Sequence, residues 1–175
     1  ADYGIDIRIW SIDPSDGRLQ LSDFLSLLDN KVRLVVVTHC SNLVGEINPV
    51  RQIADATHDA GALLLVDGVS YCPHGFPDID ALGADIYLFS TYKTYGPHQG
   101  VMVIRNVARH LFAPQSHFFN HENSMKWMVP AGPDHAQRAA ANGVIDYFDA
   151  LDEHHGGRDD SERPRRVAAL FKSAE

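Results

Sequence analysis

Short, unbroken apolar runs recur along the chain, and polar or helix-patterned segments separate them. Residues 32–37, 62–66, 86–90 and 99–104 contain these runs, and each is predicted to form a β-strand. Uninterrupted apolarity is typical of strands covered on both faces, whereas strands with one wet face alternate apolar and polar residues. The pattern therefore predicts an α/β fold with one mixed, mostly parallel sheet covered by helices.

Helical periodicity fills the intervals between the predicted strands. The segment between the first two strands has Asn48 as a candidate N-cap, Pro49 in the first turn and Gly61 at its end. Apolar residues also recur at helical spacing in 21–28, ahead of the first strand, and in 136–151, after the last one. This alternation favours strand–helix–strand units, whose strands lie parallel in one sheet.

The composition narrows the functional classes. The 175 residues are 45% hydrophobic, which suffices to bury a core, and the formal net charge is −8. Since no Lys/Arg-rich run is present to neutralise phosphates, no nucleic-acid partner is expected. The sequence has neither an apolar stretch of roughly 18 residues nor a signal-peptide pattern, so we expect no membrane association and a cytoplasmic location. Cys40 and Cys72 are too few for a disulfide framework.

Reactive side chains follow three of the predicted strands. Asn42 follows the first strand, Asp67 the second, and Ser90 with Lys93 the third. Ligands of open parallel α/β sheets bind beyond the carboxyl ends of the strands. Each residue alone would be interpreted as an ordinary turn, cap or surface residue, but their coincidence at three strand ends favours a binding site.

Competing catalytic motifs are incomplete in this sequence. It lacks the glycine patterns of dinucleotide and P-loop phosphate sites. Residues 90–93 fit S-x-x-K, but the S-D-N and K-T-G elements that accompany it in penicillin-recognising enzymes are absent. His121 and Glu122 begin like a zincin helix, but Met125 stands where the second histidine ligand belongs, so no metal site is expected.

Three segments resemble the class V aminotransferase family, particularly its cysteine-desulfurase-like branch of fold-type I pyridoxal-phosphate enzymes. The segments are RLVVVTHCSNLVGEINPVRQIADATHDAGALLLVDGVSYCPH, DALGADIYLFSTYKTYGPHQGVMV and, more weakly, PAGPDHAQRAAANGVIDYFDAL. The resemblance implies the cofactor pyridoxal 5'-phosphate (PLP), an amino-acid substrate and a homodimer. It also implies a role for each strand-end residue. Lys93 matches the catalytic lysine that forms a Schiff base with PLP, Asp67 the carboxylate beside the pyridine nitrogen, Asn42 a side chain near the phenolic oxygen, and Ser90 a phosphate-binding hydroxyl.

The sequence departs from the desulfurase pattern around the expected cofactor. Ser70 stands where desulfurases have glutamine, and Tyr92 stands where they have the histidine before the lysine. Both are still expected to contact the cofactor. The Gly-Thr pair that contacts the phosphate from a second subunit is replaced by Gly132 and Pro133.

The resemblance also predicts how the chain is organised. Residues 1–151 are expected to form part of the large PLP-binding domain, incomplete at its N-terminus. The polar stretch 152–166 is expected to be a connection, and 167–175 the start of a helix leading to a C-terminal small domain. The substrate-binding arginine and the cysteine of desulfurases would then lie outside this chain.

Three functions stay open from the sequence. The first is a PLP-dependent aminotransferase or lyase that acts on an amino acid through Lys93, with transamination, desulfuration and other eliminations all possible reactions. The second is a true cysteine desulfurase or selenocysteine lyase. The third is a non-catalytic member that keeps the fold for a structural or interaction role, and the retention of Lys93 and Asp67 argues against it.

Overall fold

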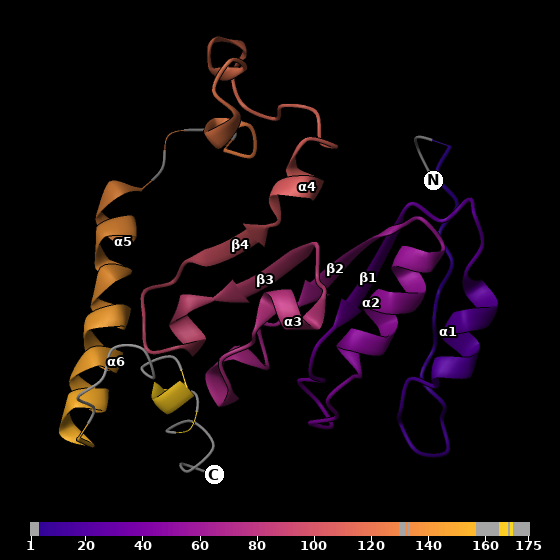
Figure 1. Ribbon diagram of the computed structural model, residues 1–175, viewed down its shortest axis with the longest axis horizontal. Helices are drawn as coiled ribbons and strands as arrows, with labels where there is room; N and C mark the ends of the chain where they lie inside the picture. The colour runs from indigo at the N-terminus through magenta and orange to yellow at the C-terminus, as the bar shows by residue number, and fades with distance from the viewer. Residues whose placement is uncertain (1–3, 130–131, 133, 157–164, 168, 170–175) are drawn as a thin grey trace.

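A four-stranded sheet forms the centre of the computed structural model, which describes residues 4–129, 132, 134–156, 165–167 and 169. The strands lie side by side in chain order (Figure 1): β1 Leu34–Thr38, β2 Leu63–Asp67, β3 Ile86–Ser90 and β4 Gly100–Ile104. β1, β2 and β3 are parallel, and β4 is antiparallel to β3. The predicted mixed, mostly parallel sheet is confirmed.

A helix precedes each parallel strand, and three more follow the sheet. The first three are α1 Leu21–Leu27, α2 Val50–Asp59 and α3 Ile79–Leu82, and the later ones are α4 Asn106–Arg109, α5 His135–Ala140 and α6 Asn142–His154. Short 3₁₀ helices occur at Cys72–His74, Thr91–Lys93, Phe118–Asn120 and Ser124–Lys126. α2 and α3 lie on the same side of the sheet (Figure 1).

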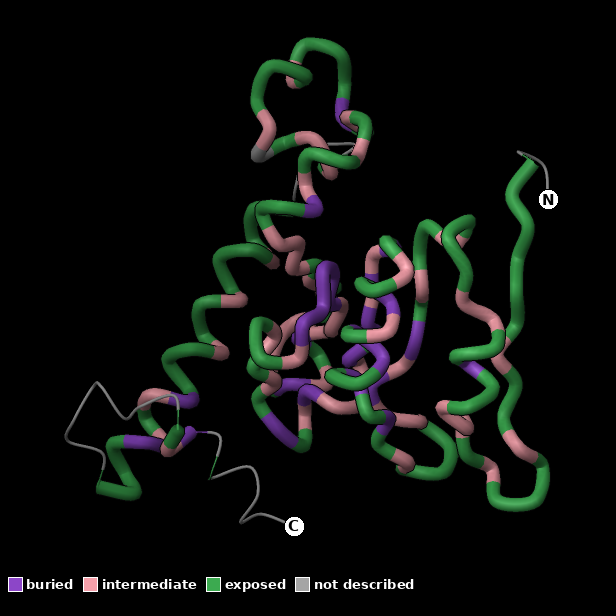
Figure 2. Tube along the Cα trace, turned by 45° about the vertical axis from the view of Figure 1, so that its right-hand side comes forward, coloured by how far each residue is buried: buried purple, intermediate pink, exposed green. Residues whose placement is uncertain are grey.

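One face of the sheet holds the hydrophobic core. Leu64 and Val66 of β2 are fully buried there, against Ile53 and Ala54 of α2 and Phe24 of α1. In Figure 2 the buried part of the chain gathers around these central strands, while the outer segments are exposed. Most of the buried apolar residues among those described belong to this cluster, and each Å² of apolar surface removed from water contributes about 25 cal/mol to stability.

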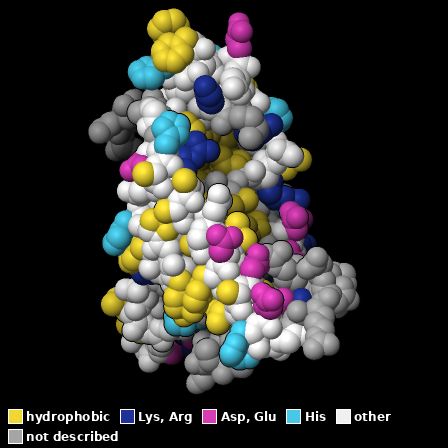
Figure 3. All heavy atoms as spheres, turned by 90° about the vertical axis from the view of Figure 1, so that its left-hand side faces the viewer, with side chains coloured by type: hydrophobic (Ala, Val, Ile, Leu, Met, Phe, Trp, Pro, Cys, Tyr) yellow, Lys and Arg dark blue, Asp and Glu magenta, His cyan; other side chains and the backbone are white. Residues whose placement is uncertain are grey.

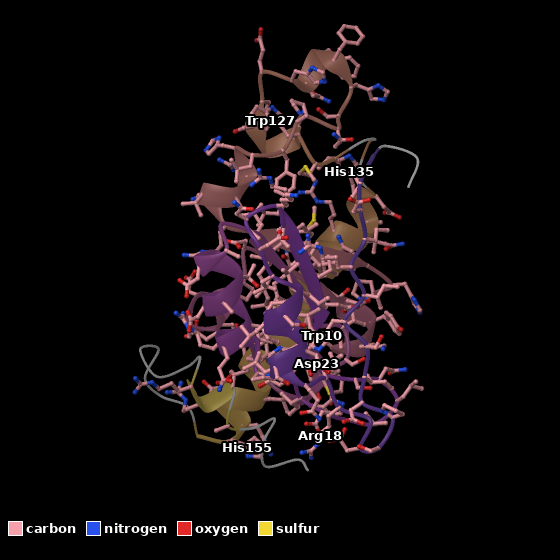
Figure 4. All side chains as sticks on the ribbon, turned by 90° about the vertical axis from the view of Figure 1, so that its right-hand side faces the viewer. Trp10, Arg18, Asp23, Trp127, His135 and His155 are labelled. Carbon is pink, nitrogen blue, oxygen red and sulfur yellow. The ribbon has the colours of Figure 1, made fainter. Side chains whose placement is uncertain are left out.

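The N-terminal segment closes one side of this core through Trp10. Its ring stacks on Phe24, with 4.8 Å between ring centroids, and its indole N–H donates to the Gln20 carbonyl oxygen at 3.1 Å. Figure 4 shows Trp10 close to Asp23 of α1, below the centre of the view, and Trp127 near the top. The half-buried Trp10 ring therefore has a partner for its one polar group, as is usual for tryptophans packed against a core.

The other face of the sheet is apolar but poorly covered by the described residues. Leu34 is 46% exposed, Val36 63% and Met102 42%. Apolar side chains are also exposed in the segment after α4, where Phe118 is 81% exposed and Phe119 68%; Figure 3 shows apolar side chains standing out at this end. The sequence predicted strands buried on both faces. Among the described residues, one face is buried and the other is largely exposed.

Two details of the helices differ from the sequence prediction. Asn48 does not cap α2, because its buried amide donates to the Thr38 carbonyl oxygen at 2.8 Å and so ties the loop to the end of β1. The predicted helix over 136–151 is two helices, α5 and α6, which meet at Ala141. Asp134 caps α5 by accepting the Gln137 N–H, a signal present in the sequence.

α6 extends through His154 and so includes the start of the stretch predicted as a polar connection. Asp152 is buried, and Arg166 compensates its charge through a two-pronged ion pair with both N–O distances 2.7 Å. Residues 157–164 of that stretch, Pro133, and all but Val167 and Ala169 of the expected terminal helix lie outside the described residues. Among the described helices, none combines the length and the apolarity that crossing a bilayer requires.

Candidate functional site

The parallel strands end together at one edge of the sheet. The register pairs Thr38 of β1 with Asp67 of β2, and Asp67 with Leu88 of β3. Because the strands run in the same direction, the residues after each of them emerge at this edge. The edge therefore receives the segments of the chain that carry the predicted site residues.

Asp67 is the last residue of β2, and it is exposed at this edge. One carboxylate oxygen accepts the Val69 N–H at 2.9 Å, which fixes the side chain in a local turn. The Asp67 carbonyl oxygen accepts the His39 N–H at 2.8 Å and so continues the β1–β2 ladder by one residue. The carboxylate is thus held in place while part of it stays open to solvent.

Asn42 and Ser70, which are 28 residues apart in the sequence, come together in space. The Ser70 hydroxyl donates to the Asn42 side-chain oxygen at 3.4 Å, and this contact joins the loop after β1 to the turn after β2. The distance is long for such a bond, so the contact is weak. Two of the predicted cofactor contacts nevertheless share one part of the edge.

Lys93 is held on a tightly bonded turn. It ends the 3₁₀ helix that directly follows β3, and its side chain is half-buried. The buried Thr91 hydroxyl donates to the Pro97 carbonyl oxygen at 2.6 Å, and the Thr94 hydroxyl donates to the Ser90 carbonyl oxygen at 3.0 Å. The Ser90 hydroxyl itself donates to the Gln99 carbonyl oxygen at 3.4 Å. These bonds fix the path of the backbone on both sides of the lysine.

α6 supports this turn from outside. A Cβ on Gly96 would lie 2.5 Å from Val144 of α6, so only glycine allows the helix to approach this closely. The preceding residue, Tyr95, has a φ of +63°, which is uncommon for a residue with a side chain, and its ring lies 5.3 Å from that of Tyr147. Backbone strain of this kind is frequent beside functional residues, and here it lies two positions after Lys93.

Tyr92 packs against an imidazole beside the lysine. Its ring is stacked on that of His98, with 4.6 Å between centroids and 5° between planes. Tyr92 is 46% exposed. The aromatic pair therefore flanks the lysine turn, with one face of the tyrosine ring occupied by His98.

The predicted residues are gathered at one edge, but they are not all in contact. Within the described part of the chain, no hydrogen bond or ion pair joins Lys93 to Asp67. A shallow groove of about 620 Å³ lies elsewhere, lined by residues 77–80 and 103–107. Since Ile104 pairs with Ile86 at the start of β3, this groove lies at the opposite end of the sheet from Lys93.

A buried polar cluster beneath Asp67 was not singled out from the sequence. His39 Nδ1 lies 2.8 Å from the Tyr87 hydroxyl, and the His39 ring stacks on Tyr71 with 3.6 Å between centroids. Burial lowers the pKa of His39 from 6.5 to about 4, so the imidazole is neutral at pH 7. The available signals were a histidine directly after a strand and a tyrosine within an apolar run, where its hydroxyl requires a partner.

Neither cysteine has the character of an activated thiol. Burial raises the pKa of Cys72 to about 11, and burial with the charge of Glu46 raises that of Cys40. A reactive cysteine needs a lowered pKa. No group of three His, Cys, Asp or Glu side chains that could hold a metal ion occurs among the described residues.

Comparisons with known proteins identify the family. The sequence profile of the family described as aminotransferase class-V matches residues 1–148. This chain belongs to the class V aminotransferase family. Members of the family use PLP, and the chain has a carboxylate, an amide, hydroxyls and an amine at the sheet edge where such a cofactor could bind.

Individual relatives agree with this assignment. The chain is 46% identical over 121 residues to the aminotransferase-like protein FGM3 of Gibberella zeae, covering 68% of this chain and 30% of that protein. It is 34% identical over 155 residues to the cysteine desulfurase-like protein ustD of Aspergillus flavus, covering 84% and 35%. The chain thus spans about a third of the length of these relatives.

The fold is shared with solved cysteine desulfurases. The crystal structure of CsdA from Escherichia coli superposes with a TM-score of 0.66 at 23% sequence identity, covering 75% of this chain and 36% of that one. At this identity the similarity concerns the fold alone. It identifies the four-stranded sheet with its helices as part of the larger α/β unit seen in desulfurases.

Proposed function

We propose that this chain provides the lysine side of the PLP site in an enzyme that acts on an amino acid. The observation that carries the proposal is the common sheet edge at which Asn42, Asp67 and the Lys93 turn emerge, in a chain of the class V aminotransferase family. The whole protein is proposed to be a homodimer, in line with the expectation from the sequence.

Each side chain at the edge has a chemical task in this proposal. Bound PLP supplies an electron-withdrawing ring that stabilises negative charge on the substrate carbon. Asp67 holds a proton on the ring nitrogen, because an exposed carboxylate anchored on one side by the Val69 N–H can accept a second hydrogen bond. Lys93 would hold the cofactor through its amine, and the same amine would carry a proton to or from the substrate carbon.

The remaining residues orient the cofactor. The Ser90 hydroxyl, at the end of β3, would bind phosphate oxygens. Asn42 and Ser70, already in contact with each other, would contact the phenolic oxygen, and the Tyr92 ring would lie beside the lysine. Each of these groups is anchored to a strand end or a bonded turn, and such anchoring limits the reorganisation needed on binding.

The decisive test is the location of the covalent bond in the whole protein. After PLP binding, borohydride reduction should fix the cofactor on the peptide that contains Tyr92, Lys93 and Thr94, as read by mass spectrometry. Lys93→Ala should abolish this linkage and nearly all turnover, whereas Lys31→Ala should leave both unchanged. Recovery of the cofactor on Lys31 or Lys126 would overturn the assignment.

Asp67 should behave differently from Lys93. Asp67→Ala removes the group that keeps the ring nitrogen protonated but leaves the amine in place. We expect the covalent linkage to persist while kcat falls by more than PLP affinity does. Equal losses of linkage in the two variants would show that Asp67 acts in attachment and not on the ring.

A second candidate is a true cysteine desulfurase or selenocysteine lyase, favoured by the similarity to ustD and by the fold shared with CsdA. Ser70 and Tyr92, which replace the residues usual in desulfurases, argue against transferring that reaction directly. Incubation of the whole protein with cysteine or selenocysteine, followed by assay for alanine, separates this candidate from a transaminase. Absence of PLP binding in the whole protein would instead indicate a non-catalytic member of the family.

A further inference from the structure

Tyr87 occupies an unusual place below the candidate site. It is the second residue of β3 and is fully buried, yet its hydroxyl reaches past β2 to His39, directly after the end of β1. On the way the ring passes beneath Gly68, where an added Cβ would lie 2.1 Å from the tyrosine ring and hydroxyl. The tyrosine thus fills the space that any side chain of residue 68 would need.

The Tyr87 hydroxyl and its neighbours also fix the turn that follows Asp67. His39 donates its backbone N–H to the Asp67 carbonyl oxygen at 2.8 Å, while its ring is bonded to Tyr87 and stacked on Tyr71. Tyr71 and Cys72 return their backbone N–H groups to the Gly68 carbonyl oxygen, at 3.0 and 2.9 Å. Cys72 belongs to the same buried cluster as Tyr87. The segment after β1 and the turn after β2 are therefore both tied to Tyr87 through these contacts.

We propose that Tyr87 is a positioning residue for the Asp67 carboxylate, acting through His39 and the Gly68 turn. A tyrosine hydroxyl can donate to or accept from an imidazole nitrogen, so the buried Tyr87 hydroxyl on Nδ1 fixes the orientation of the His39 ring in either tautomer. The fixed ring then holds the backbone of residue 39 against Asp67 from one side, while the tyrosine ring supports Gly68 from below. The inference deepens the proposed function, since Asp67 is the residue assigned there to the cofactor ring nitrogen.

The first test needs no cofactor. In the whole protein, Tyr87→Phe keeps the ring that supports Gly68 and removes only the hydroxyl. Hydrogen exchange should become at least about tenfold faster at the amides of 68–72, while the amides of β1 and β2 keep their protection. A uniform increase over the sheet, or no change, would overturn the proposal. Tyr71→Phe removes a hydroxyl from the same cluster but keeps the ring stacked on His39 and the backbone hydrogen bond to Gly68, so it serves as the matched control.

The second test asks whether Tyr87 acts through His39. We expect Tyr87→Phe to weaken PLP binding by about tenfold, by analogy with the groups that orient metal ligands, whose loss costs about 10–100-fold in affinity. It should also change the absorbance of the bound cofactor, because the proton on the ring nitrogen is held less firmly. The double variant Tyr87→Phe/His39→Gln should be no weaker than His39→Gln alone. Additive losses would refute the route through His39.

The outcomes separate this inference from the proposed function. If PLP attaches at Lys93 and Tyr87→Phe has wild-type exchange and affinity, the positioning role is wrong and the proposed function stands. If PLP attaches elsewhere or not at all, the proposed function fails, and the exchange experiment still decides whether Tyr87 holds the Asp67 turn. His39→Gln offers a second variant that breaks the same hydrogen bond should Tyr87→Phe fail to fold.

Discussion

The two faces of the central sheet have similar sequences but different surroundings. On the covered face Leu64 and Val66 are fully buried beneath α2, whereas on the open face Leu34 is 46% and Val36 63% exposed. By the alternation of side chains along a strand, Asp67 belongs to the open face and Tyr87 to the covered one. The covered face therefore provides stability and supports the site, while the open face carries the carboxylate proposed to meet the cofactor.

The largest effect expected from this comparison is on the free energy of unfolding. Leu64→Ala should lower it by about 2–5 kcal/mol, because the surrounding core cannot fully collapse into the cavity. Leu34→Ala makes the same chemical change in the neighbouring strand, on the open face, and should cost under about 1 kcal/mol in the 175-residue chain. Urea denaturation of the two variants gives both values, and similar losses would show that the open face is covered in solution.

Gly68→Ala tests how tightly the covered face packs below Asp67. The added methyl would meet the Tyr87 ring at 2.1 Å, so the tyrosine or the turn must shift, and we expect a loss of about 1–3 kcal/mol by urea denaturation. Gly100→Ala is the matched control, since an added Cβ there has no atom within 4 Å. A neutral Gly68→Ala would mean that the ring of Tyr87 can move aside freely.

The buried His39 should make stability depend on pH. Its pKa is about 4 in the folded chain and near 6.5 when unfolded, so between these values only the unfolded state takes up the proton. This contribution is present above about pH 6.5 and is lost as the pH falls toward 4, with a slope of up to about 1.4 kcal/mol per pH unit.

Denaturant titrations at several pH values measure this slope. His39→Gln should remove it, and His135→Gln, at an exposed position, should retain it. A slope that survives in His39→Gln would assign the pH dependence to another group.

The smallest effect is expected for a charge on the open face. Val36→Lys in the 175-residue chain should change the free energy of unfolding by less than about 0.5 kcal/mol, because the side chain stays in water. Parallel sheets are usually covered on both faces, and the relatives are more than twice as long as this chain. In the whole protein we therefore expect the same substitution to be clearly destabilising, and thermal melting of both forms checks this difference.

Much of the fold could be predicted from local patterns. The four apolar runs gave the strands within one or two residues, and Pro49 and Gly61 correctly bracketed α2. The role of Asn48 could not be predicted from local patterns. Its side chain is a good helix cap, but its amide donates to the Thr38 carbonyl oxygen, ten residues away, and no local rule identifies that partner. The break at Ala141 and the burial of Asp152 were equally hidden, since both depend on tertiary contacts.

The sequence by itself determined which chemical groups this protein places at its strand ends: the apolar runs define the strands, and Asn42, Asp67, Ser90 and Lys93 follow them in order. Only the tertiary structure decided how these groups are supported. Tyr87, His39 and Gly68 lie on three different strands or strand ends, and their contacts exist because parallel pairing brings those positions together. Local sequence sets the direction of a strand and its side-chain alternation, whereas a buried hydrogen bond between distant residues requires the register of the whole sheet.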